Sequence, residues 1–243
     1  MTTIRDVARA AGASTATVSH VLNGSRFVSA ETKTRVEIAI RALAYRPHGV
    51  ARSLRRSQTG TIGVMISDIA NPFFADLVLG VEDVVHRDAG SYNFILCNTL
   101  ESREKERTYF DVLSQKRVDG LILASAGGND EAVRDMIAGG LPLVCVDREL
   151  EGVKADTIVV DNRAAAQTMV RHLIAVAGID DLPWTAGLRP RLTVIAQPGR
   201  AMGREAARLL LDRIAKRRTD PPVRWVLPTE LHVRESCGAN GHG

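Results

Sequence analysis

Cysteine is scarce in this chain of 243 residues, and no two cysteines stand close together. Cys97, Cys145 and Cys237 form no C-x-x-C pair, so the sequence predicts neither a disulfide framework nor a zinc site. Cys97 and Cys145 fall within apolar, strand-like runs, where a cysteine is usually a small buried hydrophobe. We therefore expect no metal ion and no cofactor.

Long hydrophobic runs are missing as well. No apolar stretch approaches the roughly 20 residues that cross a bilayer, and the N-terminus lacks the apolar core of a secretory signal. The sequence thus predicts a cytoplasmic protein with no membrane partner. It also contains no G-x-G-x-x-G, P-loop, G-x-S-x-G or H-E-x-x-H motif, so an enzyme is not expected.

The first 24 residues carry the pattern of two short helices joined by a turn. Thr3 and Asp6 have the [ST]-x-x-[DE] spacing of a capping box, which predicts a helix to about residue 11. Gly12 supplies a tight turn, and Ser14 is placed to cap a second helix that ends near Leu22. Such a pair is typical of a helix-turn-helix, whose second helix enters the major groove of DNA.

The charge distribution favours the same interpretation. Residues 1–60 contain ten Lys and Arg against three Asp and Glu, a net charge of +7, whereas the other 183 residues carry −3. A basic segment on a mildly acidic body is typical of a protein that binds a polyanion through one module. A basic face that is merely solvated is the alternative.

A third helix is predicted from Ser29 to about Leu43, and it would close the core that two helices cannot make alone. Tyr45-Arg46-Pro47 ends it, because the residue before proline is disfavoured in the α region. We therefore assign residues 1–47 to a helix-turn-helix domain and residues 48–60 to a basic segment and linker.

From residue 61 the pattern changes to alternating strands and helices. Apolar runs begin near residues 61, 92, 118, 142 and 156, and helical segments are expected at about 73–88, 101–116, 130–138 and 162–177. This alternation predicts an α/β fold with a doubly wound parallel sheet. Ligands of such sheets bind beyond the carboxyl ends of the strands, where this chain has polar residues.

Together these segments resemble the LacI/GalR family of bacterial transcriptional repressors. Residues 3–24, T-I-x-D-V-A-x-x-A-G-x-S-x-A-T-V-S-x-V-L-N-G, are similar to the DNA-binding signature of that family. Further similar segments follow in family order: Y-R-P and A-R-S-L (45–54), T-G-T-I-G-V (59–64), N-P-F-F (71–74), V-D-G-L-I (118–122), V-D-R (146–148), V-D-N (160–162), G-I-D-D-L-P (178–183), L-T-V-I-A-Q-P (192–198) and V-R-E-S-C (233–237).

The resemblance implies a periplasmic-binding-protein-like α/β body of two subdomains, with an internal deletion in the second. Ala177-Gly178 passes directly into Ile179-Asp180-Asp181, so the family's further strands and helices are missing there. The first subdomain would comprise residues 61–160 plus 196–219. The second would keep only residues 161–195 plus 220–236, before a tail at 237–243. Unpaired sheet edges and a helix with an uncovered apolar face are expected in such a remnant.

By resemblance, the second helix contacts DNA. Three of its residues would read bases (Thr15, Ala16 and His20) and three would hold phosphates (Ser14, Thr17 and Asn23). Hydroxyl groups at a helix N-terminus suit phosphate oxygens, and an imidazole can donate to a guanine acceptor. For Ser14 and Thr17, helix capping is an alternative that is compatible with DNA binding. For His20, the alternative is a surface histidine without a partner.

The resemblance also implies a hinge helix around residues 48–56. Leu54 would insert into the minor groove at the central base step, while Arg52 and Arg55 contact phosphates. Docking of Leu54 on the larger domain is the alternative.

For a small-molecule effector, the resemblance points to residues at the carboxyl edge of the sheet. Phe73 and Phe74 would stack on the ligand, although core packing is equally compatible with their position after Asn71-Pro72. The polar contacts would come from Asp68, Asp147, Arg148, Asp161 and Asp180. Carboxylates in a cleft suit sugar hydroxyls or purine edges, but solvated strand ends are the alternative. The shortened second subdomain predicts weak effector binding.

The sequence therefore predicts a DNA-binding transcriptional repressor that binds a near-palindromic, double-stranded operator as a homodimer. Dimerisation is expected because one helix-turn-helix reads only a half-site. The alternative is a chain compromised by its deletion, which binds DNA weakly and nonspecifically without dimerising or sensing an effector. A stand-alone sugar-binding module of the same fold is disfavoured by the basic N-terminal segment.

Overall fold

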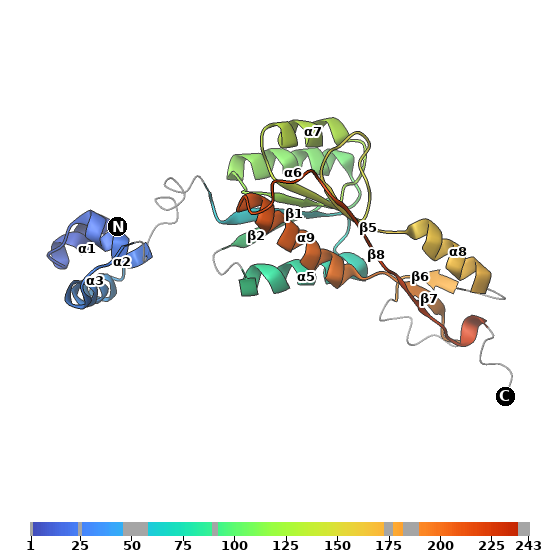
Figure 1. Cartoon of the computed structure of the whole chain (residues 1–243), viewed down its shortest axis with the longest axis horizontal. Helices are drawn as coiled ribbons and strands as arrows, with labels where there is room; N and C mark the ends of the chain where they lie inside the picture. The colour runs from blue at the N-terminus through green and yellow to red at the C-terminus, as the bar shows by residue number, and fades with distance from the viewer. Residues whose placement is uncertain are drawn as a thin grey trace. The chain divides into compact units, whose positions relative to one another are not determined.

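A computed structural model describes residues 2–23, 26–45, 58–88, 92–172, 177–181 and 190–237 (Figure 1). The chain divides into two compact units, residues 1–57 and 58–243, which we call the head and the body and describe separately. The predicted hinge contacts Arg52, Leu54 and Arg55 lie outside the described residues.

The head contains three helices, α1 (Ile4–Ala10), α2 (Thr15–Asn23) and α3 (Ala30–Ala42). The predicted capping box is confirmed: the amide of Asp6 donates to Thr3 Oγ1 (3.4 Å), and the amide of Thr3 donates to Asp6 Oδ2 (2.9 Å). Each helix contributes one fully buried valine to a shared core: Val7, Val18 and Val36. The predicted three-helix head is therefore confirmed.

The body is built on a six-stranded parallel sheet in the order β2-β1-β3-β4-β5-β8. Its strands are β1 (Thr61–Ile66), β2 (Asn93–Asn98), β3 (Leu121–Leu123), β4 (Leu143–Val146), β5 (Asp156–Val160) and β8 (Arg224–Leu227). The first five confirm the predicted strands. The sixth corrects a prediction, because β8 pairs with β5 from Thr157↔Arg224 to Val160↔Leu227. Assigning all of residues 220–236 to the second subdomain was therefore wrong for residues 224–227.

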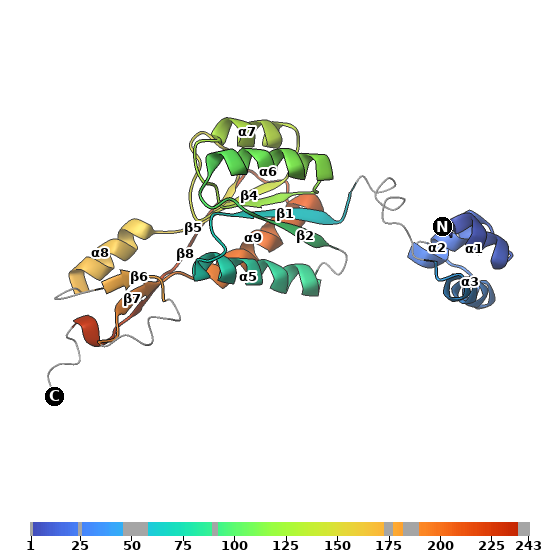
Figure 2. The same ribbon diagram turned by 180° about the vertical axis from the view of Figure 1, so that it is seen from behind.

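Helices cover both faces of this sheet (Figure 2). One face carries α5 (Pro72–Asp88) and α9 (Gly199–Ile214), and the other carries α6 (Arg103–Lys116) and α7 (Asp130–Ala138). Two separate hydrophobic clusters lie beneath these layers, which confirms the doubly wound fold. None of the helices in the described ranges is long and apolar enough to span a membrane.

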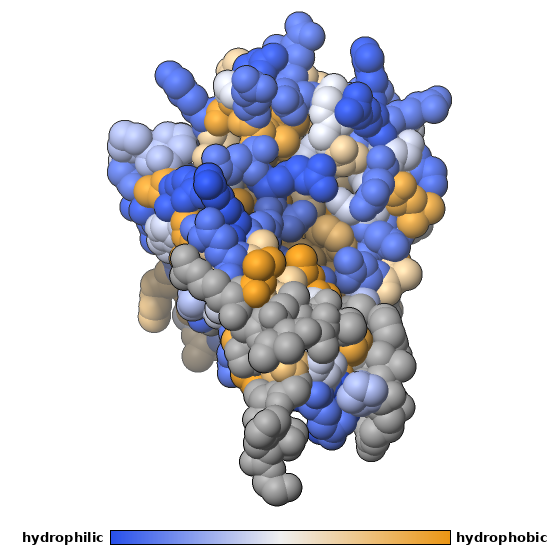
Figure 3. All heavy atoms as spheres, turned by 90° about the vertical axis from the view of Figure 1, so that its right-hand side faces the viewer, coloured by the Kyte–Doolittle hydropathy of each residue, from blue (hydrophilic) through white to orange (hydrophobic). Residues whose placement is uncertain are grey.

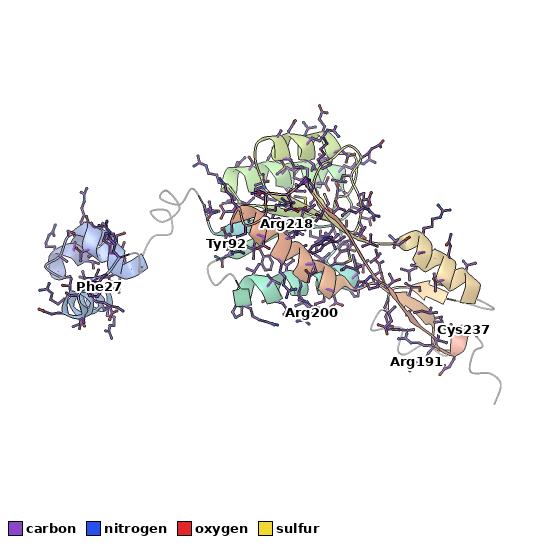
Figure 4. All side chains as sticks on the ribbon, viewed as in Figure 1. Phe27, Tyr92, Arg191, Arg200, Arg218 and Cys237 are labelled. Carbon is purple, nitrogen blue, oxygen red and sulfur yellow. The ribbon has the colours of Figure 1, made fainter. Side chains whose placement is uncertain are left out.

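Helices α5 and α9 touch through glycines, which lets their backbones approach closely. A Cβ atom at Gly203 would lie 1.9 Å from the carbonyl oxygen of Leu77, and one at Gly80 would lie 2.1 Å from that of Arg200. Asp83 on α5 accepts two hydrogen bonds of 2.9 Å from the Arg200 guanidinium on α9 (Figure 4). These bonds are the largest cause that lowers the pKa of Asp83 to about 2.

An ion pair ties the end of α9 to the start of β5. The Arg213 guanidinium donates to both carboxylate oxygens of Asp156, at 2.7 and 2.9 Å, and Asp156 is only 2% exposed. Asp156 also accepts the amide of Val223 (2.7 Å), and Arg213 donates to the carbonyl of Pro221 (3.2 Å). The pair therefore fixes the segment that leads into β8.

The part of the body that the sequence assigned to a second subdomain contains a separate, smaller sheet. Among the described residues it comprises α8 (Asn162–His172), the strands β6 (Ala177–Ile179), β7 (Thr193–Ala196) and β9 (Glu230–His232) in the order β6-β7-β9, and a 3-10 turn, η2 (Glu235–Cys237). Ala177 begins β6, so the prediction of a helix that extends to about residue 177 was wrong. Val170 on α8 is 68% exposed, and hydrophobic surface is visible at this end of the body (Figure 3).

Candidate functional site

The start of α2 presents a polar, solvent-exposed surface. Ser14, Thr15 and Ala16 are exposed, while Val18 on the inner side of the helix is fully buried. The Ser14 hydroxyl accepts the amide of Thr17 (3.0 Å) and lies 2.9 Å from the Thr17 hydroxyl. Capping by Ser14 is therefore real, and the exposed hydroxyl pair forms a polar end to the helix that DNA phosphates can approach.

The other predicted DNA contacts on α2 are either partly buried or described by their backbone alone. Thr17 and His20 are partly buried on α2, and Asn23 is the last residue of that helix, with its side chain outside the described residues. The structure thus brings together five of the predicted contacts on one short helix. Its nine residues span about 13 Å, close to the roughly 12 Å width of the major groove.

In the body, two predicted carboxylates that follow strands of different sheets interact electrostatically. Asp147 follows β4 with a φ of 73°, and Asp180 follows β6 with a φ of 68°. Burial is the main cause that raises the pKa of Asp147, the charge of Asp180 raises it further, and Arg148 beside it lowers it. Burial also raises the pKa of Asp180, against a hydrogen bond from Gln197. Both carboxylates are therefore costly to ionise in this environment.

The carboxylates of two other predicted effector contacts accept hydrogen bonds from backbone amides two or three residues further along the chain. The Asp68 carboxylate accepts the amide of Ala70 (2.9 Å), and the Asp161 carboxylate accepts the amide of Ala164 (2.8 Å) in the first turn of α8. These bonds give each group a local structural role.

The two predicted stacking rings are core residues in this structure. Phe73 and Phe74 are buried, and their rings lie edge to face with centroids 5.0 Å apart. A Cβ at Gly199 would lie 3.2 Å from the Phe73 ring, so α9 packs directly against it. Of the two interpretations, the geometry favours core packing for both rings.

Two buried polar atoms near these strand ends were not predicted. Ser67 Oγ and Gln197 Oε1 have no hydrogen-bond partner among the described residues. Ser67 directly follows β1, and Gln197 directly follows β7, in the Q-P dipeptide that ends an apolar run. Their positions at strand ends were the signal that could have marked them as candidate ligand contacts. A serine or glutamine at a strand end is too common for that signal to be specific.

Asp181 faces a different set of groups from its neighbour Asp180. Arg234 donates to both Asp181 oxygens (2.7 and 2.6 Å), and the His232 ring lies 2.8 Å from one of them. The Arg234 hydrogen bonds are the largest cause that lowers the Asp181 pKa. The adjacent carboxylates therefore diverge. No group of three His, Cys, Asp or Glu that could hold a metal occurs among the described residues.

Comparison with known proteins gives two family matches. The profile of bacterial regulatory proteins of the lacI family matches residues 3–48, and that of the periplasmic binding protein-like domain matches residues 102–237. The HTH-type transcriptional repressor PurR of Photobacterium profundum is 42% identical over 176 residues, which cover 72% of this chain and 52% of that protein. The ribose operon repressor of Halalkalibacterium halodurans is 42% identical over 174 residues, with 72% and 51% covered. The chain spans about half the length of these relatives.

Solved structures agree with the fold. The lac repressor dimer bound to operator and the anti-inducer ONPF matches with a TM-score of 0.82 at 20% identity, over 97% of this chain and 99% of that chain. The complex of the transcriptional regulator CelR with cellobiose matches with a TM-score of 0.61 at 25% identity, over 97% and 100%. The first of these similarities, at such low identity, speaks for the fold alone.

Proposed function

Because the chain belongs to the lacI family of bacterial regulatory proteins, we propose that it is a sequence-specific DNA-binding transcriptional repressor. One observation carries the proposal: the exposed, hydroxyl-rich start of α2 lies on a three-helix head within a segment of net charge +7. A helix of this kind reads base edges with its first residues, while the surrounding positive charge holds the phosphate backbone.

The repressor would act on a near-palindromic operator as a homodimer. A single helix-turn-helix covers only one half-site, and two-fold symmetry in the protein is matched by a palindrome in the DNA. Leu54 would insert at the central base step between the half-sites, with Arg52 and Arg55 on the adjacent phosphates. As a DNA-bound regulator, the protein would work in the cytoplasm, and its relatives are named as repressors, not enzymes.

Effector control would involve the pair of Asp147 and Asp180. Hydroxyl or amino groups of a sugar or nucleoside can donate to these carboxylates, and the unpartnered oxygen of Gln197 adds a further acceptor. Binding is expected to be weak, because the smaller sheet beside Asp180 has three strands in the described residues, against six in the larger sheet.

The proposal is tested by fluorescence anisotropy with a labelled palindrome that carries a central CpG step, against a scrambled duplex at the same near-physiological salt. A working dimeric repressor should prefer the palindrome by roughly a thousandfold or more. Equal, weak and steeply salt-dependent binding to both duplexes would instead support the compromised chain.

A matched pair of variants sharpens this experiment. Ala16→Glu places a carboxylate on the exposed start of α2, and Ala42→Glu makes the same charge change on the exposed end of α3. We expect the first to abolish the preference for the palindrome and the second to leave it within a few-fold. Equal effects of both variants would show that net charge alone matters, and that α2 does not read the operator.

Effector binding needs its own measurement. Titration calorimetry with a panel of sugars and purine nucleosides should give affinities weaker than micromolar, and Asp147→Ala should remove the heat of any ligand that binds. Micromolar binding would contradict the expected weakness. A signal that survives Asp147→Ala would place the effector elsewhere.

A further inference from the structure

Phe27 is a large apolar side chain with no role inside the head. It is 97% exposed, although the neighbouring Val28 is partly buried (Figure 4). The buried core of the head draws on all three helices and on Tyr45, but not on Phe27. A phenyl ring held in water in this way gains free energy only when something outside the head covers it.

The position of Phe27 in the chain limits what can cover it. It lies in the connection between α2 and α3, four residues after Asn23, so its Cα is within about 14 Å of the end of α2. Helix α2 is about as long as the major groove is wide. When its first residues lie in the groove, the end of the helix therefore reaches the groove wall. Deoxyribose rings form that wall and offer apolar faces.

We propose that Phe27 is a further DNA contact, whose ring packs on the apolar surface of the operator duplex beside the major groove. This inference rests on the proposed function. The adjacent Arg26 is also exposed and can neutralise a phosphate at the same wall. The pair would thus combine an apolar contact with a charged one at the edge of each half-site.

Salt dependence separates these two contacts. An arginine on a phosphate releases condensed counterions, so its loss lowers the slope of log affinity against log salt by about 1 per contact. A phenyl ring on a sugar or a thymine methyl releases none. Loss of the ring should therefore weaken binding at every salt concentration and leave the slope unchanged.

The experiment compares Phe27→Ala with Ile38→Ala and Arg26→Ala in the full chain, by anisotropy on the palindromic and scrambled duplexes at several salt concentrations. Ile38 is the control, because it is a 56% exposed apolar residue of α3 in the same head. Losing the Phe27 contact should cost about tenfold in affinity per head, or about a hundredfold per dimer. Ile38→Ala should match the wild type, and Arg26→Ala should reduce the salt slope.

The outcomes distinguish the inference from the function on which it rests. If the wild type has no preference for the palindrome, the proposed function fails. If it has that preference but Phe27→Ala binds as tightly, the inference alone is overturned. A lower melting temperature or weaker dimerisation of Phe27→Ala would also overturn it, since the ring would then pack on protein. Replacing thymines by uracils reveals which apolar group is touched, because a sugar contact is indifferent to the lost methyl groups and a thymine contact is not.

Discussion

Substitution of Gly203 by alanine should destabilise the body severely, although alanine is the better helix former. The added Cβ would lie 1.9 Å from the carbonyl oxygen of Leu77, 2.8 Å from its carbonyl carbon and 3.0 Å from the amide of Val81. All three atoms belong to the backbone of α5, so no side chain can rotate away. The two helices must move apart until the contact reaches at least about 3.4 Å, a shift of roughly 1.5 Å.

The magnitude follows from what lies between the helices. Four fully buried side chains at this contact, Leu77, Val81, Met202 and Ala206, belong to one hydrophobic cluster. At about 2 kcal/mol for each of the three larger side chains and about 1 kcal/mol for Ala206, their burial is worth about 7 kcal/mol, and a gap of an ångström forfeits up to half of such contacts. After the gain of about 1 kcal/mol in helix propensity, a net loss of about 3 kcal/mol remains.

Tryptophan fluorescence during thermal unfolding measures this loss in the body alone, because both tryptophans, Trp184 and Trp225, lie in residues 58–243. The midpoint should fall by roughly 6–12 °C. Gly139→Ala is the control, since Gly139 ends α7 with a φ of −70° and a Cβ there would meet nothing closer than 3.4 Å. A Gly203→Ala midpoint within 2 °C of the Gly139→Ala midpoint would refute the reasoning.

Three further outcomes are expected. Arg213→Leu should destabilise the body by about 3–5 kcal/mol in urea unfolding, because it leaves Asp156 buried and unpaired, and a loss below 1 kcal/mol would contradict this. Asp147→Asn should raise the stability of the unliganded body near pH 7, and this gain should vanish at acid pH, where the raised pKa leaves the wild-type carboxyl protonated anyway. Because the pKa of Asp83 is lowered to about 2 in the folded body, its carboxylate stabilises the body fully at pH values above the ordinary pKa of 3.8. This stabilisation is lost as the pH falls through about 2, so Asp83→Asn should make the free energy of unfolding less dependent on pH in the acid range.

The elements that the sequence predicted well are those whose signals are local. The box of Thr3 and Asp6 fixes the start of α1 within six residues, and the apolar run from residue 61 forms a strand whichever neighbours it later finds. Helix α5 begins at Pro72, where proline is tolerated because the first amide of a helix needs no partner. Both kinds of signal depend on chain geometry and not on distant contacts.

The parts that it missed depend on distant partners. Strand β8 has only four residues with alternating exposure, and what makes it a strand is its pairing with β5, more than 60 residues earlier. The roles of Phe73 and Phe74 were undecided because a ring after a strand can face a ligand or a helix. The contact of α9 with Phe73, through Gly199, favours core packing, and no local pattern contains that contact.

The charges around the proposed effector site favour one kind of ligand. Asp147 follows a strand of the larger sheet and Asp180 a strand of the smaller one, and the charge of Asp180 makes ionisation of Asp147 harder. An anionic ligand would add a third negative charge, with Arg148 as the nearby compensating cation. A neutral ligand with several hydroxyl donors would instead satisfy both carboxylates and the unpartnered oxygen of Gln197. Sugars and nucleosides have this chemistry, so we expect the proposed effector to belong to this class and not to the acidic metabolites.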